Sequence, residues 1–416
     1  MDDGRILATY RVASYLPLDH AAAVLAGEQS SGTFTKVALE SDDLMRVHGA
    51  RVESIEKNET PIDPLPGAVS AGAGAPPSVA TVAVSFPVVN LGPSIAALLA
   101  TVAGNLYELR ELAAVKLLDV EIPDALAARY TGPLHGVGGT RRLIGNPSQT
   151  MIGTIVKPSI GLTLDQLEAL VRELAEAQID FIKDDELNSD PPHAPLTDRI
   201  RVVMRTIRDV ADRTGKQTMY AFNVTGDMDD MKRAADLIAV EGGTCVMAAI
   251  PSVGFSAFAE LRRHTDLALH GHRAGFGAFD RSPSLGIGFR AFQRLARVAG
   301  ADHLHVGGIN SKFWEPNDAI VDGVRAIQED RSVGAPMLPV LSSAQTAATA
   351  ASTYELLPTP DLLVLAGGGI HAHPGGVAAG VQSMREAWHA VASGHDPRMI
   401  ATPGSALDVA LDAFGS

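Results

Sequence analysis

The sequence has a single cysteine, no long apolar run and no leader-like N-terminus. Because Cys245 has no second cysteine to pair with, the chain cannot form an internal disulfide. No apolar stretch reaches the ~18 residues that a membrane-spanning helix needs. The first residues, Met1-Asp2-Asp3-Gly4-Arg5, lack the basic and apolar regions of a secretory signal. We therefore expect a cytoplasmic protein with no membrane partner.

Basic residues are outnumbered by acidic ones. Lys and Arg total 34, Asp and Glu total 48, and the formal net charge is −14. Such a field repels the phosphates of nucleic acids and anionic membrane surfaces, so we expect neither as a partner. Apolar residues make up 46% of the chain and charged residues 20%, proportions that argue against intrinsic disorder. The 416 residues can therefore form a large globular domain beside a smaller one.

Residues 1–130 have the mixed pattern of a small α+β domain. Strand-like runs cover residues 6–12 and 79–89, and residues 19–25 have a helical pattern. The segment 61–77 is dense in Pro, Gly, Ala and Ser, which prevents regular structure, so we expect a surface loop there.

Residues 131–416 have a different pattern, in which short apolar runs alternate with amphipathic stretches of helical length. Thr163 and Gln166, for example, form the capping pattern at the start of one such helix. Eight strand and helix units in about 250 residues predict an α/β fold of the TIM-barrel type rather than an open sheet. Catalytic side chains then lie at the C-terminal ends of the strands. The expected strands are residues 151–157, 180–185, 217–224, 244–250, 267–272, 303–307, 337–342 and 362–366.

The second expected strand ends in a charged segment, Lys183-Asp184-Asp185-Glu186. Side chains alternate along a strand, so Lys183 and Asp185 share a face, and Glu186 can turn in where the strand gives way to its loop. Two carboxylates supply the oxygen ligands that Mg²⁺ prefers. A desolvated, neutral lysine can react with CO2 to form an anionic carbamate, which adds a third oxygen. The alternative is an ion-paired strand end on a solvated face.

Further candidate groups fall at other strand ends. Lys157 closes the first strand, next to the strand that carries Lys183. If both amines are buried, their like charges interact and the pKa of Lys157 is lowered. The alternative is that Lys157 is an ordinary exposed lysine. Arg273 could grip an anion or form an ion pair. Lys312 could lie on a mobile lid, although most loop lysines do not. The triplet Gly367-Gly368-Gly369 would allow a phosphate to approach the backbone, but alone it is a weak signal.

Three His-x-His pairs also lie at expected strand ends, which allows a zinc site as an alternative. No cysteine cluster or His-Glu-x-x-His motif supports zinc, and His270 and His303 precede the strand tips, where they would pack or support other groups. The pairs are His270 with His272, His303 with His305, and His371 with His373.

In this order the motifs resemble the RuBisCO large subunit, over most of the chain from Ile6 to about Trp388. The strand-end segment around Lys183 is similar to that family's carbamylated lysine with its metal-binding Asp and Glu. Lys157-Pro158 is similar to the lysine that moves protons at the substrate carbon. The remaining matches are His272-Arg273-Ala274, His303-Leu304-His305, Lys312, Gly367 to Gly369, Glu28-Gln29-Ser30-Ser31-Gly32-Thr33 and Gly104-Asn105.

This resemblance implies a ferredoxin-like N-terminal domain, a barrel and a set of site residues. Mg²⁺ would be held by Lys183, as its CO2 carbamate, and by Asp185 and Glu186. The implied catalytic residues are Lys157, Lys183, His272 and Lys312. The residues implied to bind substrate or phosphate are Glu28, Thr33, Asn105, Arg273, His305, Ser342, Gly367 and Gly368. In the family, the N-terminal ones reach the neighbouring subunit's site, which implies a homodimer or a higher multiple of dimers.

Several positions depart from the carboxylase pattern. Ser159 stands where the family has a lysine, Phe276 replaces a histidine and Phe34 replaces a tryptophan. The lid segment around Lys312 also differs from that of the carboxylases. Ser342-Ser343-Ala344 stands where the family has Ser-Gly-Gly, so a second phosphate-binding site is not implied for this chain. The chain therefore resembles the RuBisCO-like proteins, a branch that keeps metal-assisted enolisation without productive CO2 fixation.

The expected function is Mg²⁺-dependent enolisation of a small phosphorylated keto-sugar or keto acid through a metal-bound enediolate. Proton removal and return would give isomerisation or tautomerisation. Loss of CO2 from a β-keto acid would give the same enediolate, and Lys312 could then stabilise the departing carboxylate. The alternatives are a true ribulose bisphosphate carboxylase and a catalytically idle binding scaffold.

Overall fold

The structure is a computed structural model that describes residues 4–32, 37–58, 60–69, 76–92 and 94–415. The chain divides into two compact units by its internal contacts. One unit contains Met1–Thr131 together with Gly275–Ala299, and the other contains Gly132–Ala274 together with Gly300–Ser416. The segment Gly275–Ala299 thus belongs with the N-terminal unit, although it lies between two barrel strands in the sequence.

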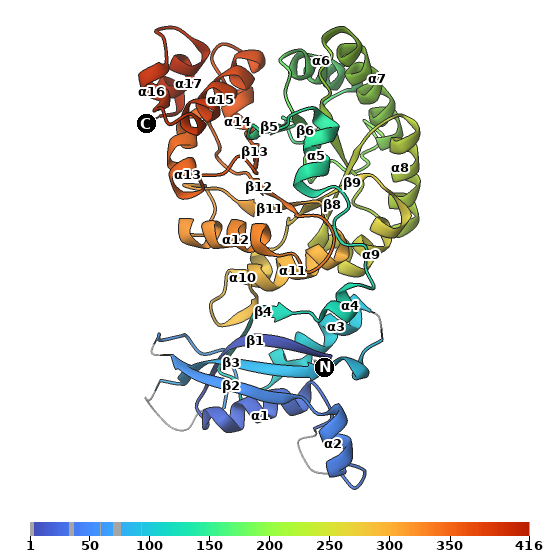
Figure 1. Cartoon of the computed structure of the whole chain (residues 1–416), viewed down its shortest axis with the longest axis vertical. Helices are drawn as coiled ribbons and strands as arrows, with labels where there is room; N and C mark the ends of the chain where they lie inside the picture. Colours follow the sequence, from blue (N-terminus) through green and yellow to red (C-terminus); the bar gives the residue numbers. More distant parts are fainter. Residues whose placement is uncertain (1–3, 33–36, 59, 70–75, 93, 416) are drawn as a thin grey trace. The chain divides into compact units, whose positions relative to one another are not determined.

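The N-terminal unit is built on a five-stranded mixed sheet with the order β10-β4-β1-β3-β2 (Figure 1). Strand β1 alternates between buried and half-buried residues over most of its length, as expected for a strand with one face in a core. The strands are β1 (Arg5–Ser14), β2 (Arg51–Asn58), β3 (Ser78–Pro87), β4 (Ala114–Glu121) and β10 (Leu285–Ile287). The helices are α1 (Leu18–Glu28), α2 (Asp42–His48), α3 (Ile95–Val102), α4 (Asp124–Ala127), α10 (Gly277–Asp280) and α11 (Phe289–Ala299).

The predicted α+β character of this unit is confirmed, as are the two strands and the helix at residues 19–25. Three strands, β2, β4 and β10, were not predicted, and for β2 and β10 the reason can be identified. Strand β2 is exposed at seven of its eight residues, so it has no apolar alternation to detect. Strand β10 pairs in parallel with β4, from which it is separated by more than 160 residues.

The second unit contains a closed barrel of eight strands in the order β11-β12-β13-β5-β6-β7-β8-β9 (Figure 1). All neighbouring strands are parallel. The eight predicted strands and the predicted TIM barrel are confirmed. The strands are β5 (Met151–Ile155), β6 (Phe181–Lys183), β7 (Met219–Asn223), β8 (Cys245–Ala249), β9 (Ala268–His272), β11 (His303–Gly307), β12 (Leu338–Leu341) and β13 (Leu363–Leu365).

Helices surround these strands, which read as nearly continuous apolar runs because they are buried on both faces. Thr163 forms the predicted capping box with Gln166 at the start of α6. Cys245 is buried in the core inside the barrel, with Met151 and Phe181. The helices are α5 (Gly136–Ile144), α6 (Leu164–Glu176), α7 (Leu196–Thr214), α8 (Met228–Val240), α9 (Ile250–His264), α12 (Asn317–Glu329), α13 (Ala350–Leu356), α14 (Gly368–His371), α15 (Val377–Ala392), α16 (Pro397–Ile400) and α17 (Ala406–Phe414).

None of the helices in the described part of the chain combines the length and the apolar composition that crossing a bilayer requires.

Candidate active site

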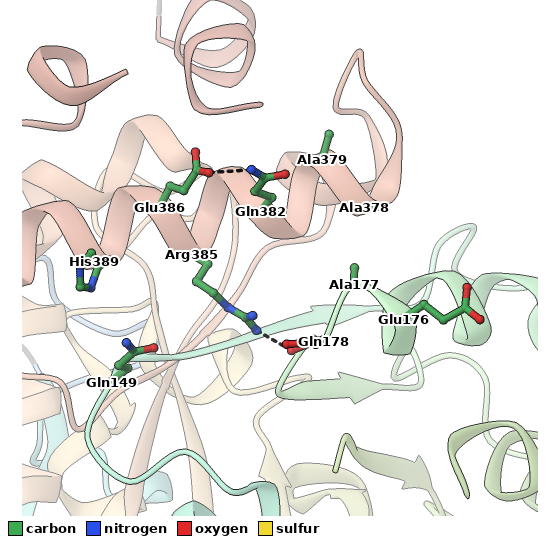
Figure 2. Close-up of a pocket in the computed structure, with 10 residues that line it drawn as sticks. All are labelled: Gln149, Glu176, Ala177, Gln178, Ala378, Ala379, Gln382, Arg385, Glu386 and His389. Atoms are coloured by element: carbon green, nitrogen blue, oxygen red, sulfur yellow. Dashed lines mark hydrogen bonds between the residues drawn. The ribbon is translucent and has the colours of Figure 1, made fainter. Parts of the chain in front are cut away.

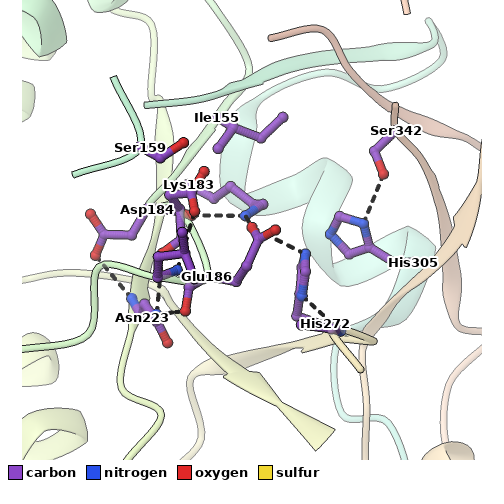
Figure 3. A network of polar contacts seen from close by, with 12 residues as sticks. Ile155, Ser159, Lys183, Asp184, Glu186, Asn223, His272, His305 and Ser342 are labelled. Carbon is purple, nitrogen blue, oxygen red and sulfur yellow. Dashed lines mark hydrogen bonds and ion pairs between the residues drawn. The ribbon is translucent and has the colours of Figure 1, made fainter. Parts of the chain in front are cut away.

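Lys183 is the last residue of β6, and its side chain is buried, with 1% of its surface exposed. Its Nζ donates to the carbonyl oxygen of Asp184 at 2.8 Å and to Oε2 of Glu186 at 3.4 Å (Figure 3). Burial lowers the pKa of the Lys183 amine, and the nearby carboxylates of Glu186 and Asp185 offset only part of that effect. The site therefore contains a buried amine beside carboxylates, not a solvated ion pair.

Lys157 follows β5 and reaches the same group of charges. Its Nζ donates to Oδ2 of Asp185 at 2.6 Å and to Oγ of Ser159 at 2.8 Å. The Lys157 side chain is 38% exposed, whereas that of Asp185 is 4% exposed. Burial alone would raise the pKa of Glu186. The positive charges of Lys183 and Lys157 and the hydrogen bonds to its carboxylate together have the larger, opposite effect, so the pKa of Glu186 lies below its usual value. Both lysines thus donate to carboxylates, Lys157 to Asp185 and Lys183 to Glu186.

Asp184 points away from these residues. Its buried carboxylate accepts hydrogen bonds from Tyr220 Oη at 2.6 Å and from Asn223 N at 3.0 Å. It also forms a fully buried ion pair with Arg199 of α7, at 3.2 Å from Nη2. Arg199 further donates to the carbonyl oxygens of Asn188, Ser189 and Ala194, so it holds the loop that follows Glu186.

Arg199 was not predicted as part of the site. It is one of several arginines on the amphipathic helix α7, but it follows the apolar spacing, three residues after Leu196 and four before Val203, and this spacing is the signal that could have identified it. Only the fold shows that this guanidinium lies behind the strand end that carries Asp185.

One predicted histidine, His272, lies beside a carboxylate, and a second, His305, packs against it. Nε2 of His272 is 3.5 Å from Oε2 of Glu186 (Figure 3), and its Nδ1 accepts from the backbone N of Ala274 at 3.1 Å. The Nε2–H of His272 therefore faces Glu186. His305 lies against His272, with ring centroids 4.3 Å apart, and its Nδ1 is 3.0 Å from Oγ of Ser342. Burial lowers the pKa of both histidines well below the usual value, so both are neutral at pH 7.

The glycine triplet forms the turn into α14, close to Lys157. A Cβ atom at Gly367 would lie 3.7 Å from Cε of Lys157, so the backbone of this turn passes directly beside the amine-bearing side chain. Gly368 has open space on the corresponding side. These features leave room for a small group next to Lys157.

Arg273 and Lys312 are placed differently. Arg273 forms a bidentate ion pair with Glu315, in which Nη1 lies 2.6 Å from Oε1 and Nη2 lies 2.5 Å from Oε2. Both side chains are nearly buried. The guanidinium is thus engaged with a carboxylate of the chain, which matches the ion-pair alternative of the sequence analysis. Lys312 is exposed, and its Nζ lies 5.7 Å from the ring centroid of Phe313.

The remaining predicted residues belong to the N-terminal unit. Nδ2 of Asn105 lies 3.5 Å from Oε1 of Glu28, so these two residues are neighbours. Thr33 and Phe34 lie outside the described residues. Phe276 is buried against Phe292, with ring centroids 4.8 Å apart. It is thus a packing residue.

A zinc site is not found in the part of the chain that the structure describes, where no three His, Cys, Asp or Glu side chains are grouped to hold a metal. Nε2 of His371 instead lies 2.9 Å from the carbonyl oxygen of Ile155, and Nε2 of His373 lies 2.9 Å from that of Ala406. The zinc alternative is therefore wrong for these pairs. At the end of β6, Asp185 and Glu186 offer two carboxylates, and Mg²⁺ is commonly held in proteins by one or two such groups together with water.

The buried histidines make stability depend on pH. Burial lowers the pKa of His303 to about 4, and the effect of His135 adds to this, whereas Asp302 opposes it. The unfolded chain binds this proton near pH 6.5, so stability is complete above that value and falls as the pH drops toward 4. Between pH 7 and pH 5 we expect His303 to contribute a loss of roughly 2 kcal/mol.

Urea unfolding at the two pH values measures this loss. In His303→Gln the decrease in unfolding free energy should be smaller by that amount, because the carboxylates that also titrate are shared by both proteins. Equal decreases in the two proteins would contradict the assignment.

A separate hollow lies between α15 and the segment that follows α6 (Figure 2). Arg385 of α15 donates to the carbonyl oxygen of Gln178 across it. None of the predicted site residues lines this hollow, so it is not part of the candidate active site. Its lining residues are Gln149, Glu176, Ala177, Gln178, Ala378, Ala379, Gln382, Arg385, Glu386 and His389.

Comparison with known proteins gives matches over nearly the whole chain. Residues 1–126 match the N-terminal domain of the ribulose bisphosphate carboxylase large chain, and residues 136–414 match its catalytic domain. The chain is 45% identical to a 3-oxo-isoapionate-4-phosphate transcarboxylase/hydrolase of Xanthobacter autotrophicus, over 98% of each chain. It is 36% identical to a 3-oxo-isoapionate-4-phosphate decarboxylase of Rhizobium etli, over 94% of each.

Among solved structures, a rubisco-like protein from Burkholderia fungorum is similar in fold and in sequence. The TM-score is 0.90 and the identity 41%, and the match covers 99% of this chain and 100% of that one.

Proposed function

Since the chain belongs to the ribulose bisphosphate carboxylase large-chain family, we propose that it is an enzyme that breaks a carbon–carbon bond of a phosphorylated 3-oxo acid by way of the substrate enolate. The grouping of Lys157, Lys183, Asp185, Glu186 and His272 at the C-terminal ends of β5, β6 and β9 carries this proposal. The names of two relatives support the substrate class, because both contain 3-oxo-isoapionate 4-phosphate. In a 3-oxo acid the carboxylate lies β to the ketone, so its loss as CO2 leaves an enolate.

The residues present fit a Mg²⁺ ion. Asp185 and Glu186 supply two carboxylates, and Lys183 is a buried amine whose lowered pKa favours the neutral form that reacts with CO2. Its carbamate would add the third anionic oxygen and remove the amine charge that repels a cation. When bound, the ion would supply electrostatic stabilisation for the oxyanion of the enolate.

The side chains around these ligands have separate tasks in the proposed reaction. The bond between the carboxylate carbon and its neighbour breaks, its electron pair stays on the neighbouring carbon, and CO2 leaves. Lys157, which keeps its Nζ hydrogen-bonded to Asp185 and Ser159, then gives a proton to that carbon and regains one from solvent, to which it is partly open. His272 presents its Nε2–H beside Glu186, where it orients the oxygens of the site.

Reaction of the purified protein with 3-oxo-isoapionate 4-phosphate, Mg²⁺ and bicarbonate in deuterated water tests this proposal. We expect the substrate to be consumed with release of CO2 and with deuterium at the carbon that carried the carboxylate. Cleavage without CO2 release would favour hydrolysis, the second candidate, which the name of the relative at 45% identity supports. Unconsumed substrate, or CO2 fixation on ribulose bisphosphate instead, would overturn the proposal.

We propose further that the active unit is a homodimer in which Glu28 and Asn105 of one subunit complete the site of the other. Each of the variants Glu28→Gln and Lys183→Met should then be inactive alone. A mixed dimer, isolated by different tags on the two subunits, would contain one site with neither substitution and should recover about half of the wild-type activity. An inactive mixed dimer, or an active monomer in light scattering, would refute this arrangement.

A further inference from the structure

A chain of hydrogen bonds runs between buried side chains inside the barrel. Oγ1 of Thr140, on α5, is 2.7 Å from Nε2 of His303, and Nδ1 of His303 is 3.3 Å from Nδ1 of His270 on the neighbouring strand. Nε2 of His270 is 2.7 Å from Nε2 of His305. Nδ1 of His305 is 3.0 Å from Oγ of Ser342 (Figure 3), so the chain ends in the candidate active site.

The three histidines of this chain are neutral at pH 7. Each is at most 3% exposed, and burial lowers the pKa of His303 to about 4 and those of His270 and His305 well below the usual value. A neutral imidazole has one N–H donor and one bare nitrogen that accepts. Each ring must therefore donate to one neighbour in the chain and accept from the other.

Thr140 sets the direction of these bonds. Its Oγ1 is 2.6 Å from the carbonyl oxygen of Gly136, and since a carbonyl cannot donate, the single hydroxyl proton of Thr140 lies between these oxygens. Oγ1 must then accept from Nε2–H of His303. Consequently His303 Nδ1 accepts from Nδ1–H of His270, and His270 Nε2 accepts from Nε2–H of His305. The last bond is donated by the Ser342 hydroxyl to the bare Nδ1 of His305.

We propose that Thr140 is a remote positioning residue, which fixes the tautomers of the histidines so that Ser342 donates its only proton inward and offers its oxygen lone pairs to the substrate. Ser342 then recognises a hydrogen-bond donor, such as a substrate hydroxyl group, and not the unprotonated oxygens of a phosphate. The sequence left both a substrate-binding and a phosphate-binding role open for Ser342, and the proposal selects the first. The inference rests on the proposed function only in assuming that substrate binds beside Ser342.

Nitrogen-15 NMR of the protein with labelled histidine tests the proposal without any substrate. Signals of His305 are assigned by their loss in His305→Gln, and the shift of each ring nitrogen reports whether it carries a proton. In the wild-type protein we expect His305 to be the Nε2–H tautomer with bare Nδ1. In Thr140→Val the acceptor for His303 is lost, so the opposite tautomer of His305 should appear, whereas Thr140→Ser should retain the wild-type signals.

Two further variants separate this effect from general damage. Thr206→Val removes another buried threonine hydroxyl, which donates to the carbonyl oxygen of Val202 within α7, and should leave the His305 signals unchanged. Ser342→Ala should also retain the Nε2–H tautomer, because the direction is set at Thr140. A protonated Nδ1 on His305 in the wild-type protein, or an unchanged tautomer in folded Thr140→Val, would overturn the proposal. If Thr140→Val does not fold, the wild-type and Ser342→Ala spectra still test the proposal, because both must show the Nε2–H tautomer of His305.

Discussion

Lys183→Met is expected to lower the rate of substrate cleavage by about 10³-fold or more, while the protein remains folded. Methionine fills the same buried space, but it has no amine that can take up CO2, so the third anionic oxygen of the proposed magnesium site is lost. The buried amine is also costly to desolvate, and its removal should therefore cost little stability. The measurement is kcat with 3-oxo-isoapionate 4-phosphate, together with circular dichroism and thermal unfolding.

Lys232→Met provides the matched control. Lys232 is also an ion-paired lysine of the barrel unit, but it bonds to Glu260 on the outside, with 27% of its side chain exposed. Its replacement should leave kcat unchanged. If Lys183→Met keeps a tenth of the wild-type rate or more, the carbamate role of this residue is wrong.

Arg199→Met is expected to destabilise the protein by about 3–5 kcal/mol. The substitution leaves the carboxylate of Asp184 buried without its counter-charge, since Arg199 and Asp184 are 1% and 0% exposed. It also removes the hydrogen bonds that hold the loop after Glu186. Urea unfolding followed by far-UV circular dichroism measures the loss, and the cleavage rate should fall as well because Asp185 and Glu186 lose support.

The same helix supplies a control for this prediction. Arg205 of α7 pairs with Glu168, but its side chain is 63% exposed, and exposed ion pairs contribute about 0–1 kcal/mol. Arg205→Met should therefore change the unfolding free energy by less than about 1 kcal/mol. Equal losses in the two variants would contradict the assigned role of the buried pair.

The barrel and much of the candidate site could be predicted because their signals are local. Most barrel strands are apolar runs of a few residues, and Lys183, Asp185 and Glu186 are consecutive or nearly so at the end of one strand. Alternation along that strand predicted that Asp184 would face elsewhere than its neighbours, and the structure turns its carboxylate toward Arg199. The pairing of Lys157 with Asp185 needed only the order of β5 and β6.

Other features depend on contacts between distant residues, which no local pattern specifies. Thr140 and Arg199 are each one polar residue among several on a helix. Their importance comes from their buried partners, because Thr140 hydrogen-bonds to His303 and Arg199 forms an ion pair with Asp184. The exposed strand β2 lacks an apolar pattern altogether. The sequence allowed two roles for Arg273, binding of an anion or an ion pair within the chain, and only the fold shows that Glu315 is its partner.

A crystal structure of the protein grown with magnesium and bicarbonate tests the central claim most directly. We predict electron density for a carbamate on Nζ of Lys183 and for one metal ion bound by its oxygen and by the carboxylates of Asp185 and Glu186. An unmodified Lys183 that still donates to the Asp184 carbonyl and to Glu186, with no ion between these side chains, would contradict the account.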